Sequence, residues 1–169
     1  MNIGFKTKAA LVTVTAISII TCIAGCVVPI GSEVGDNAPD FTLSTLDGGQ
    51  VTLSELKGKP AMLVFWTTGC SACIYQMPSL EAAKYELGDN VEFVNIDIGE
   101  SSYKVREAVD YYGFDLLVAL DTNEAVSDDY NVIYTPTNVV IDSEGVIRYI
   151  RKGAFLNEDE ILEMLSDLE

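Results

Sequence analysis

The amino-acid sequence predicts an α/β fold in which a mixed central sheet is flanked by helices. Short apolar runs, such as residues 61–65 and 116–120, alternate with stretches whose apolar residues recur every three or four positions. Strands that alternate with helices are typical of an α/β layer, and a final strand pair adds antiparallel strands to the sheet. At 169 residues the chain is long enough for one domain and a short extension.

The N-terminal segment reads as a targeting or anchoring element. Lys6 and Lys8 precede an apolar stretch that ends in Ile23-Ala24-Gly25-Cys26, which is typical of a secretory signal and resembles the bacterial lipobox, in which the cysteine becomes the lipidated N-terminus. We therefore expect residues 1–25 to be a lipoprotein-type signal peptide or a membrane anchor, residues 26–37 a linker and residues 38–169 the folded domain. Residues 9–30 are also long enough to span a bilayer uncleaved, and Cys26 is then an ordinary thiol.

The first half of the folded part is predicted to hold a hairpin, a buried strand and a long helix. The turn Asp47-Gly48-Gly49 joins extended residues 38–43 to a strand at 50–53, and Ser54 is expected to cap a short turn. The run 61–65 has no polar residue, as expected for a strand buried on both faces. The helix that follows, closed by residues 88–90, carries its apolar residues at helical spacing: Ile74, Met77, Leu80, Ala83 and Leu87.

The second half alternates in the same way and ends in a hairpin and a helix. Asn157 and Glu160 form a capping pair for that last helix. The remaining predicted elements are a strand at 91–98, a loop at 99–101, a helix around 105–112 ended by Gly113, a strand at 116–120, a short helix within 121–130, an extended segment at 132–136, and a hairpin of 139–141 with 146–150 around the turn 142–145.

The chemistry is predicted to lie in the segment from Trp66 to Cys73, where a strand gives way to a helix. The first helical turn has free N–H groups and the positive end of the helix dipole, which stabilise a thiolate on Cys70. Cys73, one turn further on, is close enough to resolve a mixed disulfide. The alternatives are an inert pair or half of a zinc site. Zinc needs about four ligands, and the chain has no second Cys-x-x-Cys and no histidine.

The amino-acid composition disfavours or excludes several kinds of partner and of catalytic site. The chain has 26 acidic and 10 basic residues and a net charge of −16, which disfavours nucleic acid and anionic lipid headgroups as partners. The absence of histidine excludes Cys-His catalysis and imidazole metal ligands. Because Cys22 and Cys26 lie in the N-terminal segment, the domain holds one close cysteine pair, which is not a stabilising disulfide framework.

These motifs together resemble the TlpA/ResA type of membrane-anchored thiol–disulfide oxidoreductase, within the thioredoxin-like, AhpC/TSA-related superfamily. The resemblance covers about residues 35–169 and rests on Ala38-Pro39-Asp40-Phe41, Phe65-Trp66, Cys70 to Cys73, Pro78, residues 95–101, Leu120-Asp121, Thr135-Pro136-Thr137 and residues 141–145. It implies a thioredoxin-like fold with an N-terminal β-hairpin and a central strand–helix insertion.

The resemblance also implies a function and a location. The chain is expected to reduce protein disulfides on the extracytoplasmic face of the cell membrane through the Cys70–Cys73 dithiol, with no other cofactor and no metal. Apocytochrome c is one candidate substrate. The implied partners are protein thiols or disulfides, a membrane electron donor such as a transmembrane thiol reductase, and the membrane itself through the N-terminal anchor.

Residue roles carry over at matching positions. Trp66, Thr135 and Pro136 are expected to bind substrate, with Thr135-Pro136 as a cis-proline loop facing the disulfide. Glu100 matches an acid implicated in proton handling, and we expect burial beside two sulfurs to raise its pKa; the alternative is a solvated loop carboxylate. Gln76 replaces an active-site glutamate of some relatives.

Two further positions depart from the family pattern. Gly69 replaces the common aromatic residue before the first cysteine, which opens the surface around Cys70. Val64 stands where thioredoxin has a buried acid, so that group cannot take the proton of Cys73.

Two other functions remain in competition. A thiol peroxidase is suggested by Ala38-Pro39-Asp40-Phe41 and by Thr67-Thr68-Gly69-Cys70, although the usual proline before that threonine is missing. A metallochaperone of the copper-assembly kind is also thioredoxin-like, but that kind uses a longer cysteine spacing and a histidine. Metal titration of the reduced protein separates the metallochaperone from the two enzymes.

Overall fold

The computed structural model describes residues 28–166 and 168, which form one mixed seven-stranded sheet with helices on both faces. The strand order is β2-β1-β5-β4-β3-β6-β7. The elements are β1 (Thr42–Thr45), β2 (Gln50–Thr52), the 3-10 helix η1 (Leu53–Leu56), β3 (Ala61–Trp66), α1 (Ser71–Leu87), the 3-10 helix η2 (Gly88–Asn90), β4 (Glu92–Ile98), α2 (Ser102–Tyr112), β5 (Val118–Asp121), α3 (Ala125–Asp129), β6 (Thr137–Ile141), β7 (Ile147–Lys152) and α4 (Glu158–Ser166).

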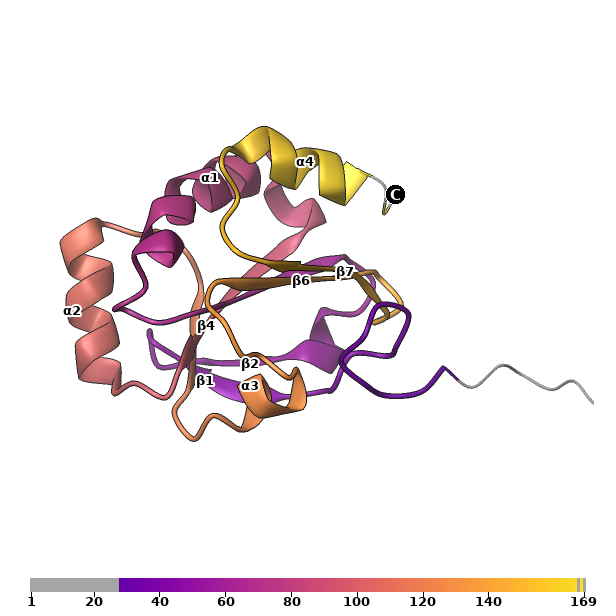
Figure 1. Cartoon of the computed structure of the whole chain (residues 1–169), viewed down its shortest axis with the longest axis horizontal. Coiled ribbons are helices and arrows are strands. Elements are labelled where there is room, and N and C mark those ends of the chain that lie inside the picture. Colours follow the sequence, from indigo (N-terminus) through magenta and orange to yellow (C-terminus); the bar gives the residue numbers. More distant parts are fainter. Residues whose placement is uncertain (1–27, 167, 169) are drawn as a thin grey trace, which may run out of the picture.

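The sheet is built around β3, every residue of which is buried. β3 is parallel to β4, and β4 is parallel to β5, whereas β6 runs antiparallel to β3. The chain passes from β3 to β4 through α1 and from β4 to β5 through α2, and α4 packs beside α1. The short helix α3 lies on the opposite face of the sheet (Figure 1). These relations confirm the predicted α/β class with its mixed sheet, hairpin and strand–helix insertion.

Side-chain alternation along β3 and β4 divides the core into two layers. Met62, Val64 and Trp66 belong to the buried cluster under α1, α2 and α4, whereas Leu63 and Phe65 belong to the cluster on the α3 side. Because successive residues of a strand point to opposite faces, each position along these strands has a defined layer. Asn95 and Asn138, which pair with Val64, and Asp97, which pairs with Trp66, therefore lie in the layer that α1 covers.

Three strand ends meet at one edge of the sheet. Trp66, the last residue of β3, is paired with Asp97 of β4, and Phe65 is paired with Thr137 at the start of β6. The loop to α1, the loop from β4 to α2 and the loop that enters β6 therefore all leave the sheet at this edge. Cys70, Glu100 and Pro136 are carried by these three loops.

Local details differ from expectation at two places. Residues 132–136, expected to be extended, form a loop with a bend, and the strand begins only at Thr137. Ser54 does not cap η1 with its side chain; instead its backbone N–H donates to Asp40 Oδ1 at 2.8 Å. In contrast, the capping of α4 is as predicted, because the Glu160 backbone N–H donates to Asn157 Oδ1 at 3.1 Å.

The segment expected to be a linker makes ordered contacts where it is described. Asn37 bridges to Val146, and the Ile147 N–H donates to the Asp36 carbonyl at 2.9 Å, so this stretch lies against the start of β7. Residues 1–27, which include Cys22 and Cys26, lie outside the described residues. Within residues 28–166, the structure has no helix long and apolar enough to cross a membrane.

Candidate active site

The two cysteines lie at the start of α1 and are joined in a disulfide. Cys70 is the N-cap residue, and its Sγ accepts a hydrogen bond from the Cys73 backbone N–H at 3.1 Å. Cys70 is partly exposed, whereas Cys73 is fully buried. The predicted position of the pair is confirmed, and its geometry makes Cys70 the sulfur that a partner can reach.

Gly69 keeps the approach to Cys70 open. The residue is exposed, and a Cβ atom placed on it would meet no heavy atom within 4 Å. Ser71 and Ala72 between the cysteines are exposed as well and carry no charge. The residues on either side of Cys70 in the chain therefore add little bulk and no charge.

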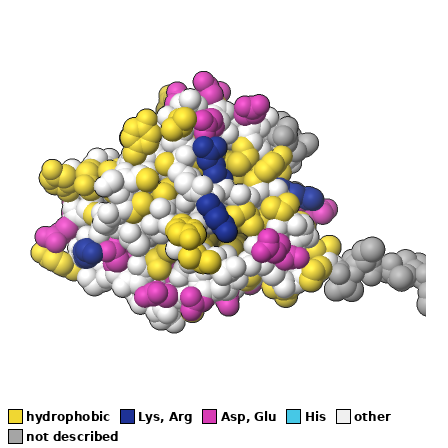
Figure 2. Space-filling model, in the orientation of Figure 1, with side chains coloured by type: hydrophobic (Ala, Val, Ile, Leu, Met, Phe, Trp, Pro, Cys, Tyr) yellow, Lys and Arg dark blue, Asp and Glu magenta, His cyan; other side chains and the backbone are white. Residues whose placement is uncertain are grey.

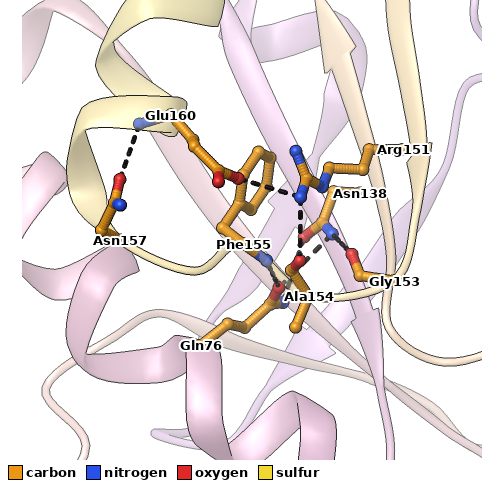
Figure 3. A network of polar contacts seen from close by, with 8 residues as sticks. All are labelled: Gln76, Asn138, Arg151, Gly153, Ala154, Phe155, Asn157 and Glu160. Carbon is orange, nitrogen blue, oxygen red and sulfur yellow. Dashed lines mark hydrogen bonds and ion pairs between the residues drawn. The ribbon is translucent and has the colours of Figure 1, made fainter.

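α1 is held in place by a buried amide on its inner face. Gln76 Nε2 donates to Asn138 Oδ1 at 3.1 Å, and Gln76 Oε1 accepts from the Phe155 backbone N–H at 3.2 Å (Figure 3). Asn138 Nδ2 in turn donates to the Gly153 carbonyl at 3.0 Å. Gln76 and Asn138 are both buried and cannot reach water, so each amide needs partners within the protein, and these hydrogen bonds supply them. Gln76, noted from sequence only as a missing acid, thus joins α1 to β6 and to the loop before α4.

The same network continues to the surface through Arg151. Its guanidinium donates to the Ala154 carbonyl at 3.1 Å, lies 2.9 Å from a Glu160 carboxylate oxygen and stacks 4.5 Å above the centre of the Phe155 ring (Figure 3). Phe155 itself is 1% exposed. The loop from β7 to α4 is consequently fixed beneath α1 at several points, which gives the cysteine helix a rigid support.

Glu100 binds the loop that carries Cys70. The Thr68 backbone N–H donates to Glu100 Oε2 at 2.6 Å, the Thr68 hydroxyl donates to Oε1 at 3.0 Å, and Lys104 forms an ion pair with the same carboxylate. Burial pushes the pKa of Glu100 upward, but the bonds from Lys104 and Thr68 outweigh it and hold the pKa below its ordinary value. The expectation of a raised pKa for Glu100 is therefore wrong, because its donors favour the ionised form.

The raised pKa belongs to Asp97, a residue that sequence reasoning missed. Asp97 is fully buried, and neither carboxyl oxygen accepts a hydrogen bond of normal geometry. Burial and contact with the Glu100 carboxyl raise the pKa of Asp97 to about 8, against smaller opposing effects of the Glu100 backbone N–H and Lys104. The signal available in the sequence was an acid inside a strand that is otherwise largely apolar, three residues before Glu100.

The loop that enters β6 contains the proline expected to be cis. The Thr135–Pro136 peptide bond is cis, as predicted. The Pro136 carbonyl accepts from the Gly153 N–H at 2.8 Å, and the Thr137 hydroxyl donates to the Tyr134 carbonyl at 2.7 Å. Ile133 and Tyr134 are each 66% exposed just before it. This loop leaves the sheet at the same edge as the cysteine loop and presents apolar side chains to solvent.

Trp66 has a different place from the one expected. Its side chain is fully buried in the α1 layer, with its ring edge-to-face with Phe114 at a centroid distance of 6.2 Å. An indole with no exposed surface offers a substrate nothing to contact in this structure. Trp66 instead packs in the same buried cluster as Cys73.

A partly exposed N-cap cysteine, a buried partner one turn on and a cis-proline loop at the same sheet edge define a thioredoxin-like thiol–disulfide oxidoreductase. The Redoxin family model matches residues 33–166, and the chain belongs to that family. Thioredoxin-like protein YneN of Bacillus subtilis is 36% identical over 83% of this chain and 82% of its own length. Thiol-disulfide oxidoreductase ResA of the same organism is 37% identical over 70% of this chain and 67% of its own.

A solved structure agrees with these relatives. The pneumococcal exposed lipoprotein thioredoxin Etrx1 of Streptococcus pneumoniae superimposes with a TM-score of 0.66 and 32% identity, covering 77% of this chain and all of that one. Together the comparisons confirm the thioredoxin-like fold and the ResA-like thiol–disulfide oxidoreductase class that the motifs indicated.

Proposed function

We propose that this protein reduces disulfide bonds of other proteins, with the Cys70–Cys73 dithiol as the electron source. The supporting observation is the absence of positive charge at Cys70 combined with acidic groups nearby. The first turn of α1 has no basic residue, Lys104 is bound to Glu100, and Cys70 Sγ accepts its hydrogen bond from the Cys73 backbone N–H. A thiolate that the helix N-terminus stabilises without the help of a neighbouring cation makes the dithiol a better reductant than one that also has a cation beside it, because the disulfide form is then more favoured.

The exchange proceeds in two balanced steps. The Cys70 thiolate attacks one sulfur of the substrate disulfide, the substrate S–S bond breaks, and the first substrate sulfur leaves as a thiolate. The Cys73 thiol then loses its proton and attacks Cys70 Sγ, which forms the Cys70–Cys73 disulfide and releases the second substrate thiolate. Two electrons pass from the dithiol to the substrate, and the buried position of Cys73 restricts its sulfur to the second step.

The loop with Thr135 and Pro136 is proposed to hold the substrate backbone beside Cys70. Tyr134 and Ile133 lie just before the cis bond and are two-thirds exposed, and Tyr75 of α1 is 63% exposed. Apolar and aromatic side chains of this kind suit an extended peptide with apolar side chains better than a highly charged peptide. Acidic side chains are prominent elsewhere on the visible face of the molecule, with few basic ones between them (Figure 2).

The location is proposed to be the extracytoplasmic face of the cell membrane. The segment that ends in Ile23-Ala24-Gly25-Cys26 supports cleavage before Cys26 and lipidation of that cysteine, and a similar solved protein is described as an exposed lipoprotein. A protein that reduces disulfides there needs a supply of electrons, for which a transmembrane thiol reductase is the fitting donor. Apocytochrome c remains one candidate substrate.

Cleavage before Cys26 and lipidation of that cysteine can be checked by mass spectrometry of the membrane-extracted protein. We expect an N-terminal, lipidated Cys26 with residues 1–25 removed, because two acyl chains give stable anchoring where one is marginal. A Cys26→Ser variant should then leave the membrane fraction or remain unprocessed. An intact chain that still begins at Met1 would instead show a helical anchor.

The function itself is tested with reduced protein and oxidised insulin in the absence of other thiols. We expect about one insulin disulfide reduced for each dithiol oxidised, and none by Cys70→Ser. Hydrogen peroxide is offered in a parallel sample. Faster oxidation by peroxide than by insulin would overturn the proposal in favour of a thiol peroxidase, and tight metal binding without thiol exchange would favour a metallochaperone.

A further inference from the structure

A buried carboxyl group lies in the core layer that also contains Cys73, on a strand that carries none of the expected site residues. Asp97 is paired in register with Trp66, and Trp66 belongs to the same buried cluster as Cys73. Phe93 of the same strand also belongs to that cluster, so alternation along β4 places Asp97 in the layer under α1. Asp97 and Cys73 thus occupy the same buried layer at the edge of the sheet where the cysteine loop begins.

Two side chains of this layer, those of Asp97 and Trp66, have polar atoms that lack a hydrogen-bond partner. Both carboxyl oxygens of Asp97 and the neighbouring Trp66 Nε1 are buried without a hydrogen-bond partner. An unsatisfied buried polar group costs about 1–3 kcal/mol, so one retained in the core usually has a functional reason. The carboxyl that Asp97 does approach, Glu100, is an acceptor as well. Two carboxyl groups in contact attract each other only when one of them is protonated. Because Thr68 and Lys104 donate to Glu100 and favour its ionised form, the proton lies on Asp97.

The second step of the exchange needs a proton acceptor at this depth. Cys73 is fully buried, and its thiol must lose a proton before it attacks Cys70 Sγ. The chain has no histidine, and Val64 occupies the neighbouring strand position in the same layer. Among the described residues, the carboxyl that β4 supplies to this layer is that of Asp97.

We propose that Asp97 accepts the proton that the Cys73 thiol loses during resolution and that Glu100 passes it on to solvent. The inference rests on the dithiol exchange proposed above and assigns its proton transfer. When Cys73 attacks Cys70 Sγ, the new S–S bond forms, the bond from Cys70 to the substrate sulfur breaks, and the proton of Cys73 goes to the ionised carboxylate of Asp97. Glu100, whose side chain is 12% exposed, connects that carboxyl with the surface.

The acid–base properties of the site fit this role. A pKa of about 8 for Asp97 lies close to that of an ordinary thiol, about 8.5, so the proton can move in either direction at little cost. The charged groups that act on Asp97 are Glu100, in the loop before α2, and Lys104 of α2, and Cys73 of α1 lies in the same buried layer. Lys104 is neutralised by Glu100, so removal of the Glu100 charge is expected to lower the pKa of Asp97.

The test uses the reduced full chain and the aromatic disulfide dithionitrobenzoate, whose coloured thiolate is released twice. The first release follows attack by Cys70, and the second follows attack by Cys73. At about pH 7 we expect Asp97→Asn to slow the second release about tenfold or more, the loss expected of a general base. The first release should change by less than about twofold, because Asn and protonated Asp carry the same charge. The matched control is Asp110→Asn on the exposed side of α2, which should leave both releases unchanged.

The pH profile keeps the proposal falsifiable if Asp97→Asn folds poorly. In the wild type, the rate of the second release should rise with pH and level off near about pH 8. Glu100→Gln should move the midpoint of this rise to lower pH. In Asp97→Asn the rate of the second release should instead keep rising until the pH reaches the pKa of the Cys73 thiol. A second release with the same rate and profile in Asp97→Asn and the wild type would overturn the role of Asp97. Loss of the first release in the wild type would instead overturn the proposed function.

Discussion

The backbone N–H of Thr68 donates a 2.6 Å hydrogen bond to Glu100 Oε2, which joins the loop before Cys70 to the loop before α2. The bond is one of two from the same threonine, and Lys104 holds the carboxylate from the other side. Thr68 lies two residues before Cys70, so the position of the attacking sulfur depends on a carboxylate from a different strand-to-helix connection. Through Glu100 the same loop is connected to the buried carboxyl of Asp97.

The different exposure of the two cysteines predicts which variant traps a substrate. Cys70 is reachable and Cys73 is not, so Cys73→Ser should accumulate a mixed disulfide between Cys70 and a partner protein, because the resolving thiol is gone. Cys70→Ser should accumulate none. The measurement is non-reducing electrophoresis of each variant after exposure to an oxidised protein. Equal trapping by the two variants would contradict the assignment of roles.

The buried carboxyl of Asp97 predicts a pH-dependent stability of a definite sign. Its pKa is about 8 in the folded protein and about 3.9 in an unfolded chain, so the folded state binds more protons between these values. The stability that protonated Asp97 contributes is fully present below about pH 4 and is lost as pH rises through about 8. Asp97→Asn cannot ionise, so its stability relative to the wild type should rise by up to about 1.4 kcal/mol for each pH unit between about pH 4 and 8.

This prediction is measured as the free energy of unfolding in urea, for both proteins in the disulfide form, at several values between about pH 5 and 8. The difference between the two proteins is the useful quantity, because Asp142, whose pKa is lowered by Val146, Arg148 and Glu144, contributes equally to both. The gap should widen as pH rises. Two parallel stability curves would mean that Asp97 has an ordinary pKa in the folded protein.

The strength of the Gln76 network predicts a large effect of one core amide. Gln76→Ala removes the donor to Asn138 Oδ1 and the acceptor of the Phe155 N–H, both of which stay buried, so the free energy of unfolding should fall by about 2–3 kcal/mol. Tyr75→Ala, one residue earlier and 63% exposed, should change it by less than about 0.5 kcal/mol. A double variant with Asn138→Ala should lose less than the sum of the single losses, because the two amides share their bonds. Additive losses would show that the two amides act independently.

The parts of the fold that depend on local pattern could be predicted from the sequence. The buried strand before Cys70, the helix start at the cysteines and the cap at Asn157 each follow from a few neighbouring residues. Thr135 and Pro136 were assigned by their resemblance to a known motif, and the peptide bond between them is cis. These features need no knowledge of which distant residues come together.

The chemistry beneath the site could not be predicted in the same way, because it depends on long-range contacts. The pKa of Glu100 is lowered by Lys104 and by Thr68, which lies on another loop, and that of Asp97 is raised by burial and by Glu100. The family resemblance implies that Trp66 is part of the substrate surface. The register with β4 places it in the core instead. Gln76 likewise gains its role only from Asn138, 62 residues further along the chain.

The central claim, that the Cys70–Cys73 dithiol is a reductant, is tested most directly by its reduction potential. The protein is equilibrated with thiol–disulfide buffers of known potential, and the fraction with a disulfide is measured by alkylation. The lack of a cation beside Cys70 and the acidic pair nearby predict a potential below about −220 mV, at or below that of the glutathione pool. A value near about −120 mV, which belongs to a strong oxidant, would contradict the account.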